Sequence, residues 1–397
     1  MSKVYSLPTR PPDGSASVTG IASVEEILAE LRAGRMVLIL DDEDRENEGD
    51  LIMDAQCATP EAVAFMIRHS SGIICVPMDP EQLARLDLPQ MVPNNDEAYR
   101  TAFTVSVDYR FGTTTGVSSS DRSATIRALV DPGSSPQDFS RPGHIFPLRP
   151  RRGGVLIRAG HTEAAMDLCM LAGLKPAGVL CELMNDDGSM ARRAQIEGFA
   201  REHGLKIGTI ADLIRYRLRN ERTVERISEQ TVQTELGEFR LVAYEDRVHR
   251  GVHLALVRGR LDQPVAPLVR VHVADTLRDL LGIRADARAW TLRAALERIA
   301  ESGSGVVVIL REPEGAQELT EALRSLTPLP VGAPQAAPAA EKQQAGAARA
   351  VLRTYGIGAQ ILKDLGVRRM RVLSAPKQMH GISAFDLEVE SYLGEEP

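Results

Sequence analysis

Cysteine is scarce in this sequence of 397 residues, and no two cysteines lie close together. The four are Cys57, Cys75, Cys169 and Cys181. Disulfide frameworks and cysteine-ligated zinc sites need closely spaced pairs such as Cys-x-x-Cys, and the sequence contains none. Cys75 and Cys181 lie in apolar runs, where a cysteine is usually a small buried hydrophobic residue. Cysteine usage therefore indicates neither a disulfide framework nor a zinc site.

An excess of positive charge and a long apolar run are also lacking. The 47 Lys and Arg are outnumbered by 54 Asp and Glu, which gives a net charge of −7. Such a balance offers no basic surface for nucleic acid. No apolar run approaches the roughly 20 residues of a membrane span, and the amino terminus lacks a signal-peptide core. We therefore expect no nucleic-acid or membrane partner, and a cytoplasmic location.

Length and composition predict two domains. Residues 1–14 are rich in Pro, Ser and Gly and are predicted to form a flexible leader. A charged stretch, Arg215–Arg222, is predicted to end a helix before a new strand pattern begins. We therefore place the first domain at residues 15–220 and the second at residues 222–397. Residues 328–348 form a low-complexity insert that is not expected to pack into a core.

Apolar periodicity in the first domain alternates between helix and strand patterns. Helices are predicted over Val24–Arg32, Pro60–His69 and His161–Leu171. Strands are predicted over Met36–Leu40, Gly72–Met78, Phe103–Tyr109, Val155–Arg158 and Gly178–Met184. The pattern predicts intermixed α and β structure, with a mixed sheet and flanking helices.

What the sequence has in excess is negative charge at one point. Seven of the ten residues from Asp41 to Asp50 are carboxylates, and they directly follow the predicted strand Met36–Leu40. Oxygen ligands at a strand end suit a hard cation such as Mg²⁺. A solvated acidic turn is the alternative. Arg45 inside the run, placed to face an anionic substrate, weighs toward a functional site.

Further polar residues follow later strands and helices. The segment Arg158–Glu163 leads into a predicted helix, whose free amides beside Arg158 form a candidate phosphate site. Within it, Thr162 is expected to cap the helix with its hydroxyl, and His161 is a candidate ligand or base. His144 lies in a Pro-Gly loop, and Glu182 ends an apolar strand. Polar residues placed this way by strands are typical of active sites.

Five motifs occur in one order over the first domain: DDEDRENEGD, RHSSGIICVPM, RPGHIFPLR, RAGHTEAAMDL and AGVLCELMNDDGSMAR. They resemble, segment by segment, the 3,4-dihydroxy-2-butanone 4-phosphate synthase family of riboflavin biosynthesis. The resemblance implies conversion of ribulose 5-phosphate to dihydroxybutanone phosphate and formate, through an enediolate stabilised by Mg²⁺ or Mn²⁺. It also implies an α+β fold around a mixed sheet, and a homodimer.

Carried onto this chain, the family's motif assigns roles to residues by position. The implied catalytic pair is His144 and Glu182, and the implied metal ligands are Glu46 and His161. The implied substrate contacts are Arg45, Glu46, Asp50, Arg158, Ala159, Gly160, His161, Thr162 and Glu182. Every position holds the residue type that the motif requires. Which of His144 and Glu182 acts at each proton transfer stays open.

The second half resembles GTP cyclohydrolase II over about residues 222–397, which implies a second α/β domain, but it lacks several residues of that family's motif. The positions of the three zinc cysteines hold Asp275, Asp286 and Arg288, and no cysteine follows residue 181. Other differences are Val273-Ala274 for Ser-Glu, Glu312–Ala316 for the glutamine- and glycine-rich GTP-binding run, and Val351 for the catalytic aspartate, although Arg353 remains.

These substitutions predict that the second domain does not hydrolyse GTP and binds no zinc. Two further roles are open for such a domain, a structural one and a regulatory one. In the regulatory case it would bind a nucleotide or flavin, with Arg270, Arg353 and Lys377 as candidate anion contacts. A bifunctional enzyme with unusual metal ligands is the remaining alternative.

Overall fold

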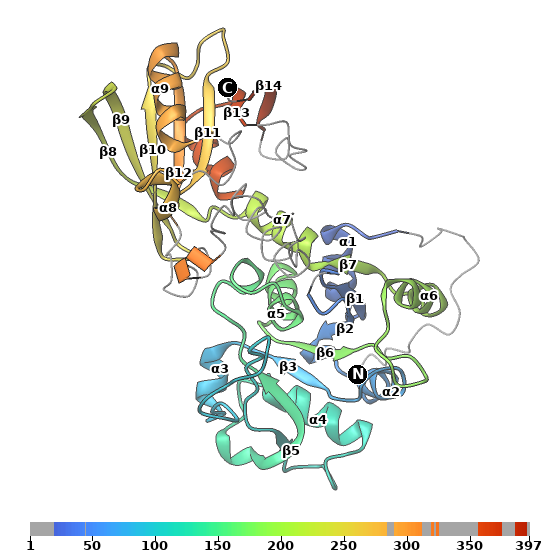
Figure 1. Ribbon diagram of the computed structural model, residues 1–397. Coiled ribbons are helices and arrows are strands. Elements are labelled where there is room, and N and C mark those ends of the chain that lie inside the picture. Colours follow the sequence, from blue (N-terminus) through green and yellow to red (C-terminus); the bar gives the residue numbers. More distant parts are fainter. Residues whose placement is uncertain are drawn as a thin grey trace, which may run out of the picture. The chain divides into compact units, whose positions relative to one another are not determined.

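The computed structural model describes residues 20–43, 45–283, 290–311, 319–320, 323–324, 356–374 and 386–394. The chain divides into two compact units, residues 1–216 and residues 217–397, and both appear in Figure 1. The predicted leader and low-complexity insert lie outside the described residues. Within the described part, no helix is both long and apolar enough to cross a membrane.

The first unit is built on one sheet of seven strands in the order β4-β5-β3-β6-β2-β1-β7. The pairs β1·β7 and β3·β5 are parallel and the other pairs antiparallel, so the sheet is mixed, as predicted. The strands are β1 (Val37–Leu40), β2 (Gly49–Asp54), β3 (Cys75–Pro77), β4 (Val107–Tyr109), β5 (Phe139–Leu148), β6 (Gly178–Glu182) and β7 (Ile207–Thr209).

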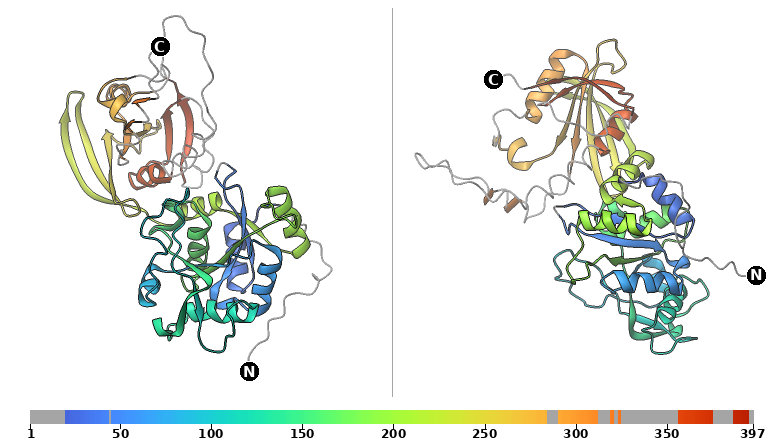
Figure 2. Two further views of the ribbon diagram at one scale, coloured as in Figure 1. Left: turned by 60° about the horizontal axis from the view of Figure 1, so that its bottom comes forward. Right: turned by 90° about the vertical axis from the view of Figure 1, so that its right-hand side faces the viewer.

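Helices lie on both faces of this sheet (Figures 1 and 2). Contacting one face are α1 (Val24–Arg32) and α5 (His161–Leu171). The other face forms the main core with α2 (Pro60–His69), α4 (Ser119–Leu129) and α6 (Arg193–His203). The remaining helices are α3 (Pro80–Arg85) and α7 (Ile210–Asn220).

Local sequence explains where these helices begin. Ser23 caps α1 in a capping box with Glu26, and Thr59 caps α2, which has Pro60 in its first turn. Ser118 caps α4 by accepting from the amide of Asp121. The predicted bounds of α1, α2 and α5 agree with the structure.

One predicted strand is wrong and three are too long, since β6 also ends at Glu182 and not at Met184. Residues Gly154–Leu156 form a 3₁₀ helix instead of the strand predicted over Val155–Arg158. The cause is a turn at Gly153 and Gly154, whose φ angles are 92° and 62°. Only the shorter strands β3 and β4 occur within the stretches predicted over residues 72–78 and 103–109.

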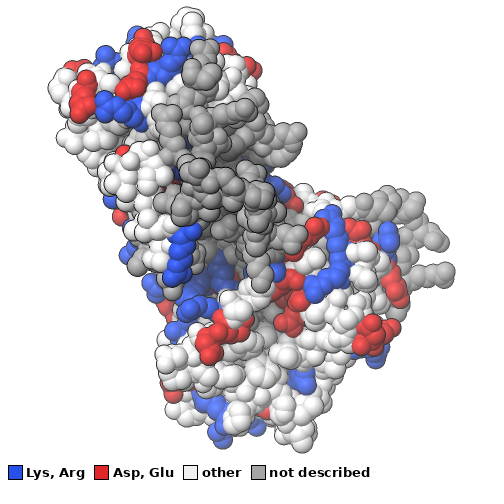
Figure 3. Space-filling view, in the orientation of Figure 1, with Lys and Arg blue, Asp and Glu red and all other residues white. Residues whose placement is uncertain are grey.

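The second unit has its own seven-stranded mixed sheet, in the order β14-β13-β11-β12-β10-β9-β8. One face packs against α9 (Leu292–Ser302), and the other against the helical residues 356–364. The other elements are β8 (Val224–Thr234), β9 (Gly237–Asp246), β10 (Gly251–Arg258), β11 (Leu268–Val273), α8 (Thr276–Asp279), β12 (Gly305–Leu310), β13 (Arg369–Leu373) and β14 (Glu388–Leu393). On the surface drawn in Figure 3, acidic and basic side chains are interspersed.

Candidate active site

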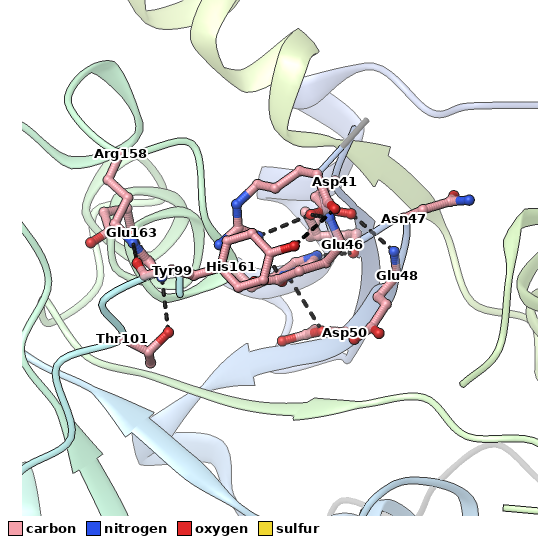
Figure 4. A network of polar contacts seen from close by, with 12 residues as sticks. Asp41, Glu46, Asn47, Glu48, Asp50, Tyr99, Thr101, Arg158, His161 and Glu163 are labelled. Atoms are coloured by element: carbon pink, nitrogen blue, oxygen red, sulfur yellow. Dashed lines mark hydrogen bonds and ion pairs between the residues drawn. The ribbon is translucent and has the colours of Figure 1, made fainter. Parts of the chain in front are cut away.

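The acidic segment after β1 forms a loop that returns into β2, and its first carboxylate organises it. The Asp41 side chain is fully buried. Its Oδ1 accepts a hydrogen bond from the amide of Glu48 at 2.9 Å. Its Oδ2 accepts from the amide of Glu46 at 3.1 Å and from Arg45 Nη1 at 2.9 Å. The loop is therefore folded around Asp41, which fixes the position of Glu46 (Figure 4).

Arg45 is held between carboxylates and an aromatic ring. Its side chain is only 5% exposed, and its Nη1 lies 2.6 Å from Glu46 Oε2. The guanidinium carbon lies 4.9 Å from the centre of the Tyr99 ring, a cation–π contact. The Tyr99 hydroxyl also donates to the backbone carbonyl of Arg45 at 3.1 Å. Tyr99 therefore holds both the side chain and the backbone of Arg45.

His161, the first residue of α5, faces this loop with one ring nitrogen. Its Nε2 lies 3.0 Å from the carbonyl of Ile39 in β1, so this nitrogen carries a proton and donates. Its Nδ1 lies 3.7 Å from Glu46 Oε2 and 3.5 Å from Asp50 Oδ1. A backbone carbonyl that fixes one nitrogen and leaves the other toward carboxylates is the usual arrangement of a metal-binding histidine.

The electrostatics of the site are strongly coupled. Burial opposes the charged form of His161, but Asp50, Glu46 and Asp41 outweigh burial and raise the pKa of His161 to about 9. Burial raises the pKa of Asp50 to about 7, even though the charge of His161 opposes this. Burial also disfavours ionised Glu46, but its hydrogen bond to His161 and the charge of Arg45 lower the pKa of Glu46. The site thus concentrates negative charge around one imidazole.

These groups fit a divalent cation. Asp41, Glu46 and His161 each offer a ligand atom, and the three atoms lie within 4.8 Å of one another. Asp50 Oδ1 is buried and accepts no hydrogen bond from the described residues. Carboxylate oxygens with one imidazole nitrogen suit Mg²⁺ or Mn²⁺. Because Asp41 already accepts three hydrogen bonds, Glu46 and His161 are the better ligand candidates, and Asp41 positions Glu46.

Glu182 lies at the end of β6, directly beside Asp50. The two residues are register partners in the antiparallel pair of β6 and β2. Ser71 fixes Glu182 twice, because its hydroxyl donates to Glu182 Oε2 at 2.7 Å and its amide donates to the Glu182 carbonyl at 2.8 Å. The Glu182 carboxylate is therefore held in a defined orientation, on the strand beside Asp50.

His144 lies in a bulge of β5. Val107 and Asp108 are adjacent in β4 but pair with residues on either side of Arg141–His144, which therefore bulges out. The His144 amide donates to Asp108 Oδ1 at 2.9 Å, and its ring Nδ1 lies 2.7 Å from Asp108 Oδ2. Because the carboxylate accepts from Nδ1, the other ring nitrogen is left to exchange a proton.

The sheet register brings the two predicted catalytic residues toward each other. Phe146, Cys75 and Leu180 form one row across β5, β3 and β6. His144 precedes Phe146 by two residues, and Glu182 follows Leu180 by two. Because β5 and β6 run in opposite directions, both residues lie at the same end of the sheet with β3 between their strands.

Arg158 is held beside the start of α5 by three acceptors. Its guanidinium donates to Glu163 Oε2 at 2.7 Å and to Thr101 Oγ1 at 2.9 Å. Its Nε donates to the carbonyl of Tyr99 at 3.1 Å. Tyr99 therefore contacts both Arg45 and Arg158.

The start of α5 differs in one detail from the prediction. Gly160 is the capping residue and makes no side-chain hydrogen bond, so the predicted cap by the Thr162 hydroxyl is wrong. The first amides of a helix have no partner within it, and here those of His161 and Thr162 follow Arg158 and Ala159. The segment thus retains the amide and guanidinium donors of an anion site.

Among the residues that contact the site, the sequence did not single out Ser71, Tyr99, Thr101 and Asp108. Each contacts a predicted site residue from a segment distant in the chain. Ser71 lay within a quoted motif and Asp108 within a predicted strand, but nothing indicated that they contact Glu182 and His144.

In the second unit, residues at the positions of the cyclohydrolase motif make structural contacts. Asp275, at the first zinc position, is the N-cap of α8 and accepts from the amide of Arg278 at 2.9 Å. His272 Nε2 lies 2.9 Å from Asp279 Oδ2. Arg270 donates to two backbone carbonyls, those of Leu373 and Trp290. Asp286, Arg288, Glu312–Ala316, Val351, Arg353 and Lys377 lie outside the described residues.

Comparison with known proteins agrees with both resemblances. Residues 25–216 match the family model of 3,4-dihydroxy-2-butanone 4-phosphate synthase, and residues 225–394 match that of GTP cyclohydrolase II. The 3,4-dihydroxy-2-butanone 4-phosphate synthase of Pseudomonas aeruginosa is 50% identical over 371 residues, covering 94% of this chain and 98% of that protein. The riboflavin biosynthesis protein RibBA of Salinispora arenicola is 46% identical over 386 residues, covering 94% and 88%.

A solved structure has the same two-domain architecture. The crystal structure of RibBX, a two-domain 3,4-dihydroxy-2-butanone 4-phosphate synthase from A. baumannii, covers 94% of this chain and 99% of its own. It superposes with a TM-score of 0.77 at 43% identity. The chain therefore belongs to the 3,4-dihydroxy-2-butanone 4-phosphate synthase family and is an enzyme of riboflavin biosynthesis with a second domain of the GTP cyclohydrolase II family.

Proposed function

We propose that the first unit converts ribulose 5-phosphate to 3,4-dihydroxy-2-butanone 4-phosphate and formate, with Glu46 and His161 as metal ligands and His144 and Glu182 as the catalytic pair. The observation that carries this proposal is the orientation of His161. Its Nε2 is fixed by the Ile39 carbonyl, and its Nδ1 faces Glu46 and Asp50.

The metal is Mg²⁺ or Mn²⁺ in this proposal, because the candidate ligands are carboxylates and one imidazole and include no thiolate. Bound there, the ion supplies Lewis-acid stabilisation of the negative charge that develops on the substrate oxygens. Glu46 holds its place through Asp41, and His161 through Ile39. Both ligands are thereby positioned by the protein before an ion or a substrate arrives.

His144 and Glu182 move the protons. The Asp108 carboxylate accepts from His144 Nδ1, so Nε2 is the nitrogen that exchanges a proton with the substrate. Glu182 is oriented by Ser71 and lies beside Asp50, a proposed contact of the substrate.

The substrate phosphate is bound by Arg158 and the first two amides of α5, those of His161 and Thr162, whereas the Gly160 amide donates to the Arg158 carbonyl at 2.8 Å. Arg45, which also contacts Tyr99, contributes a second positive charge. Anchoring the phosphate holds the carbon chain of the substrate in a fixed position relative to His144 and Glu182, the proton-transfer groups.

A metal-binding measurement tests the ligand assignment apart from turnover. Glu46→Gln removes the charge and keeps the shape, and we expect Mn²⁺ affinity measured by electron paramagnetic resonance to fall at least tenfold. Glu43→Gln is the matched control, since Glu43 is an exposed carboxylate of the same loop. Equal Mn²⁺ affinity in the two variants would remove Glu46 from the ligand set.

We infer that the second unit does not hydrolyse GTP. Of the three positions that hold zinc cysteines in the cyclohydrolase family, Asp275 serves as a helix N-cap in this chain, and the others are Asp286 and Arg288. Arg270 is occupied by backbone carbonyls. The relative from P. aeruginosa, which matches this chain over nearly its whole length, is named for the synthase alone.

The zinc content of the purified protein tests this inference without an assay for GTP. Elemental analysis is expected to give far less than one zinc per chain, because an aspartate whose Oδ1 caps α8 is a poor replacement for a thiolate ligand. One tightly bound zinc per chain, lost on replacing Asp275 with Ala, would contradict it. The homodimer and the cytoplasmic location remain predictions. Size-exclusion chromatography with light scattering tests the homodimer.

A further inference from the structure

We propose that Gly116 is a positioning residue for His144: the absence of a side chain there gives the Asp108 carboxylate the space from which it orients the imidazole. The proposal rests on the proposed catalytic role of His144. Gly116 lies outside β4 and β5, in the segment that leads into α4.

The Asp108 carboxylate occupies the space beside Gly116 where a side chain would begin. A Cβ built on Gly116 would lie 2.1 Å from Asp108 Oδ2, 2.4 Å from its Cγ and 2.8 Å from its Oδ1. All three distances are below the 3.0 Å that real Cβ contacts respect. Any side chain at position 116 must therefore push the Asp108 carboxylate away, and the two oxygens it displaces are those that contact His144.

Gly116 itself is tied in place and cannot easily yield. Its φ angle is 84°, which favours glycine. Its amide donates to Asp121 Oδ2 at 3.1 Å, and the Thr114 hydroxyl donates to the same oxygen at 2.8 Å. Asp121 is only 4% exposed and lies in the first turn of α4, whose N-cap is Ser118. The peptide at Gly116 is thus anchored to a helix that packs on the sheet.

The strand on the other side also limits where Asp108 can go. A Cβ on Gly143 would lie 2.0 Å from the carbonyl carbon of Val107 and 2.3 Å from the amide nitrogen of Asp108. The bulge of β5 therefore lies directly against the backbone of β4 just before Asp108. The backbone of Asp108 is thus packed against β5, and its carboxylate lies against Gly116 with both oxygens in contact with His144.

Displacing Asp108 has a specific chemical consequence. When Nδ1 donates to the carboxylate, Nε2 is the nitrogen without a proton and serves as the base. Without that acceptor the ring can turn or adopt the other tautomer. A side chain at position 116 is therefore expected to lower kcat about 10- to 100-fold while KM changes less than threefold, because substrate-binding groups are not moved.

Gly112→Ala is the matched control for Gly116→Ala. Gly112 lies in the same segment with a φ angle of 70°, so alanine meets the same backbone penalty there. Nothing lies within 4 Å of the Cβ that the substitution would add. We expect Gly112→Ala to keep kcat within about threefold of the wild type and Gly116→Ala to lose at least tenfold. Equal losses in the two variants would mean that backbone strain, not Asp108, explains the effect.

A double-mutant cycle with Asp108→Ala gives the decisive comparison. If Gly116 acts only through Asp108, Gly116→Ala has little left to disturb once Asp108 is alanine. Its further effect on kcat in the Asp108→Ala background should then be no larger than the effect of Gly112→Ala in the wild type. The two losses are in that case not multiplicative. Multiplicative losses would overturn the proposal. Should Gly116→Ala alone fail to fold, the double variant, in which the clash is absent, is expected to fold. Its failure to fold would equally overturn the proposal.

Nitrogen NMR of the imidazole separates this proposal from the role assigned to His144. With His144→Gln to assign the signal, wild type and Gly112→Ala are expected to show a protonated Nδ1 at neutral pH, and Gly116→Ala a shift toward the other tautomer. An unshifted spectrum would overturn the positioning role of Gly116. Full activity of His144→Gln would instead overturn the catalytic role of His144, whatever the tautomer.

Discussion

Asp41→Asn tests whether the acidic loop is folded around one buried carboxylate. The wild-type side chain accepts three hydrogen bonds, from the amides of Glu46 and Glu48 and from Arg45. Hydrogen bonds to a charged group contribute about 1.5–3 kcal/mol each. Asparagine keeps one carbonyl oxygen, but its amide nitrogen faces a donor, and its neutral side chain leaves the buried guanidinium of Arg45 with one carboxylate partner fewer. We expect a local loss of about 3 kcal/mol.

Amide hydrogen exchange measures this loss of local stability directly, because two of the three groups that donate to Asp41 are backbone amides. A loss of about 3 kcal/mol corresponds to roughly a hundredfold faster exchange of the Glu46 and Glu48 amides. Mn²⁺ affinity is expected to fall about 10- to 100-fold, since Glu46 is no longer held toward His161. Glu43→Gln, an exposed carboxylate in the same loop, should change neither quantity.

Exchange at both amides within threefold of the wild type would show that Asp41 does not hold the loop. A second contrary outcome is faster exchange with unchanged Mn²⁺ affinity. In that case Asp41 would organise the loop, but the loop would not position the metal ligand.

Three further substitutions give distinct expectations. Tyr99→Phe removes the hydroxyl bond to the Arg45 carbonyl and keeps the ring, so we expect KM to rise about two- to tenfold with little change in kcat, and an unchanged KM would contradict the positioning of Arg45. Ser71→Ala frees the Glu182 carboxylate and is expected to lower kcat about tenfold with KM nearly constant; a selective rise in KM would instead make Ser71 a substrate contact. The third concerns stability against pH. Burial disfavours ionised Asp246, but the hydrogen bonds that its carboxylate accepts outweigh burial and lower the pKa of Asp246. The contribution of this carboxylate to the free energy of unfolding is therefore complete above the ordinary carboxyl pKa of about 4 and is lost as the pH falls below that value. Asp246→Asn is therefore expected to destabilise the second unit by about 2 kcal/mol at pH 7 and to reduce the acid dependence of its unfolding, and thermal unfolding with an unaltered acid dependence would contradict this.

Local patterns predicted the elements that carry most of the site. The helix that begins at His161 and the strands that end in the acidic loop and at Glu182 follow from apolar periodicity alone. The error over Val155–Arg158 has a physical cause. An apolar, partly β-branched run indicates a strand, but two glycines with positive φ before it turn the chain into a 3₁₀ helix.

Contacts between distant segments are what the sequence could not show. Asp108 and His144 meet only because Arg141–His144 bulges from β5, and no periodicity predicts that shift in register. Tyr99 reaches Arg45 from a segment with no helix or strand pattern. Within the acidic run, the sequence likewise did not distinguish the buried organiser Asp41 from the exposed Glu43.

The most direct test of the account is a paired assay on one purified sample of the full chain. Formate and dihydroxybutanone phosphate are followed from ribulose 5-phosphate with Mg²⁺, and formate and pyrophosphate from GTP with Zn²⁺. We predict turnover of the pentulose phosphate and none of GTP above a protein-free blank. Turnover of GTP would contradict the account, because it would show a working cyclohydrolase site despite Asp275, Asp286 and Arg288. Failure to turn over the pentulose phosphate would contradict the assignment of the first unit.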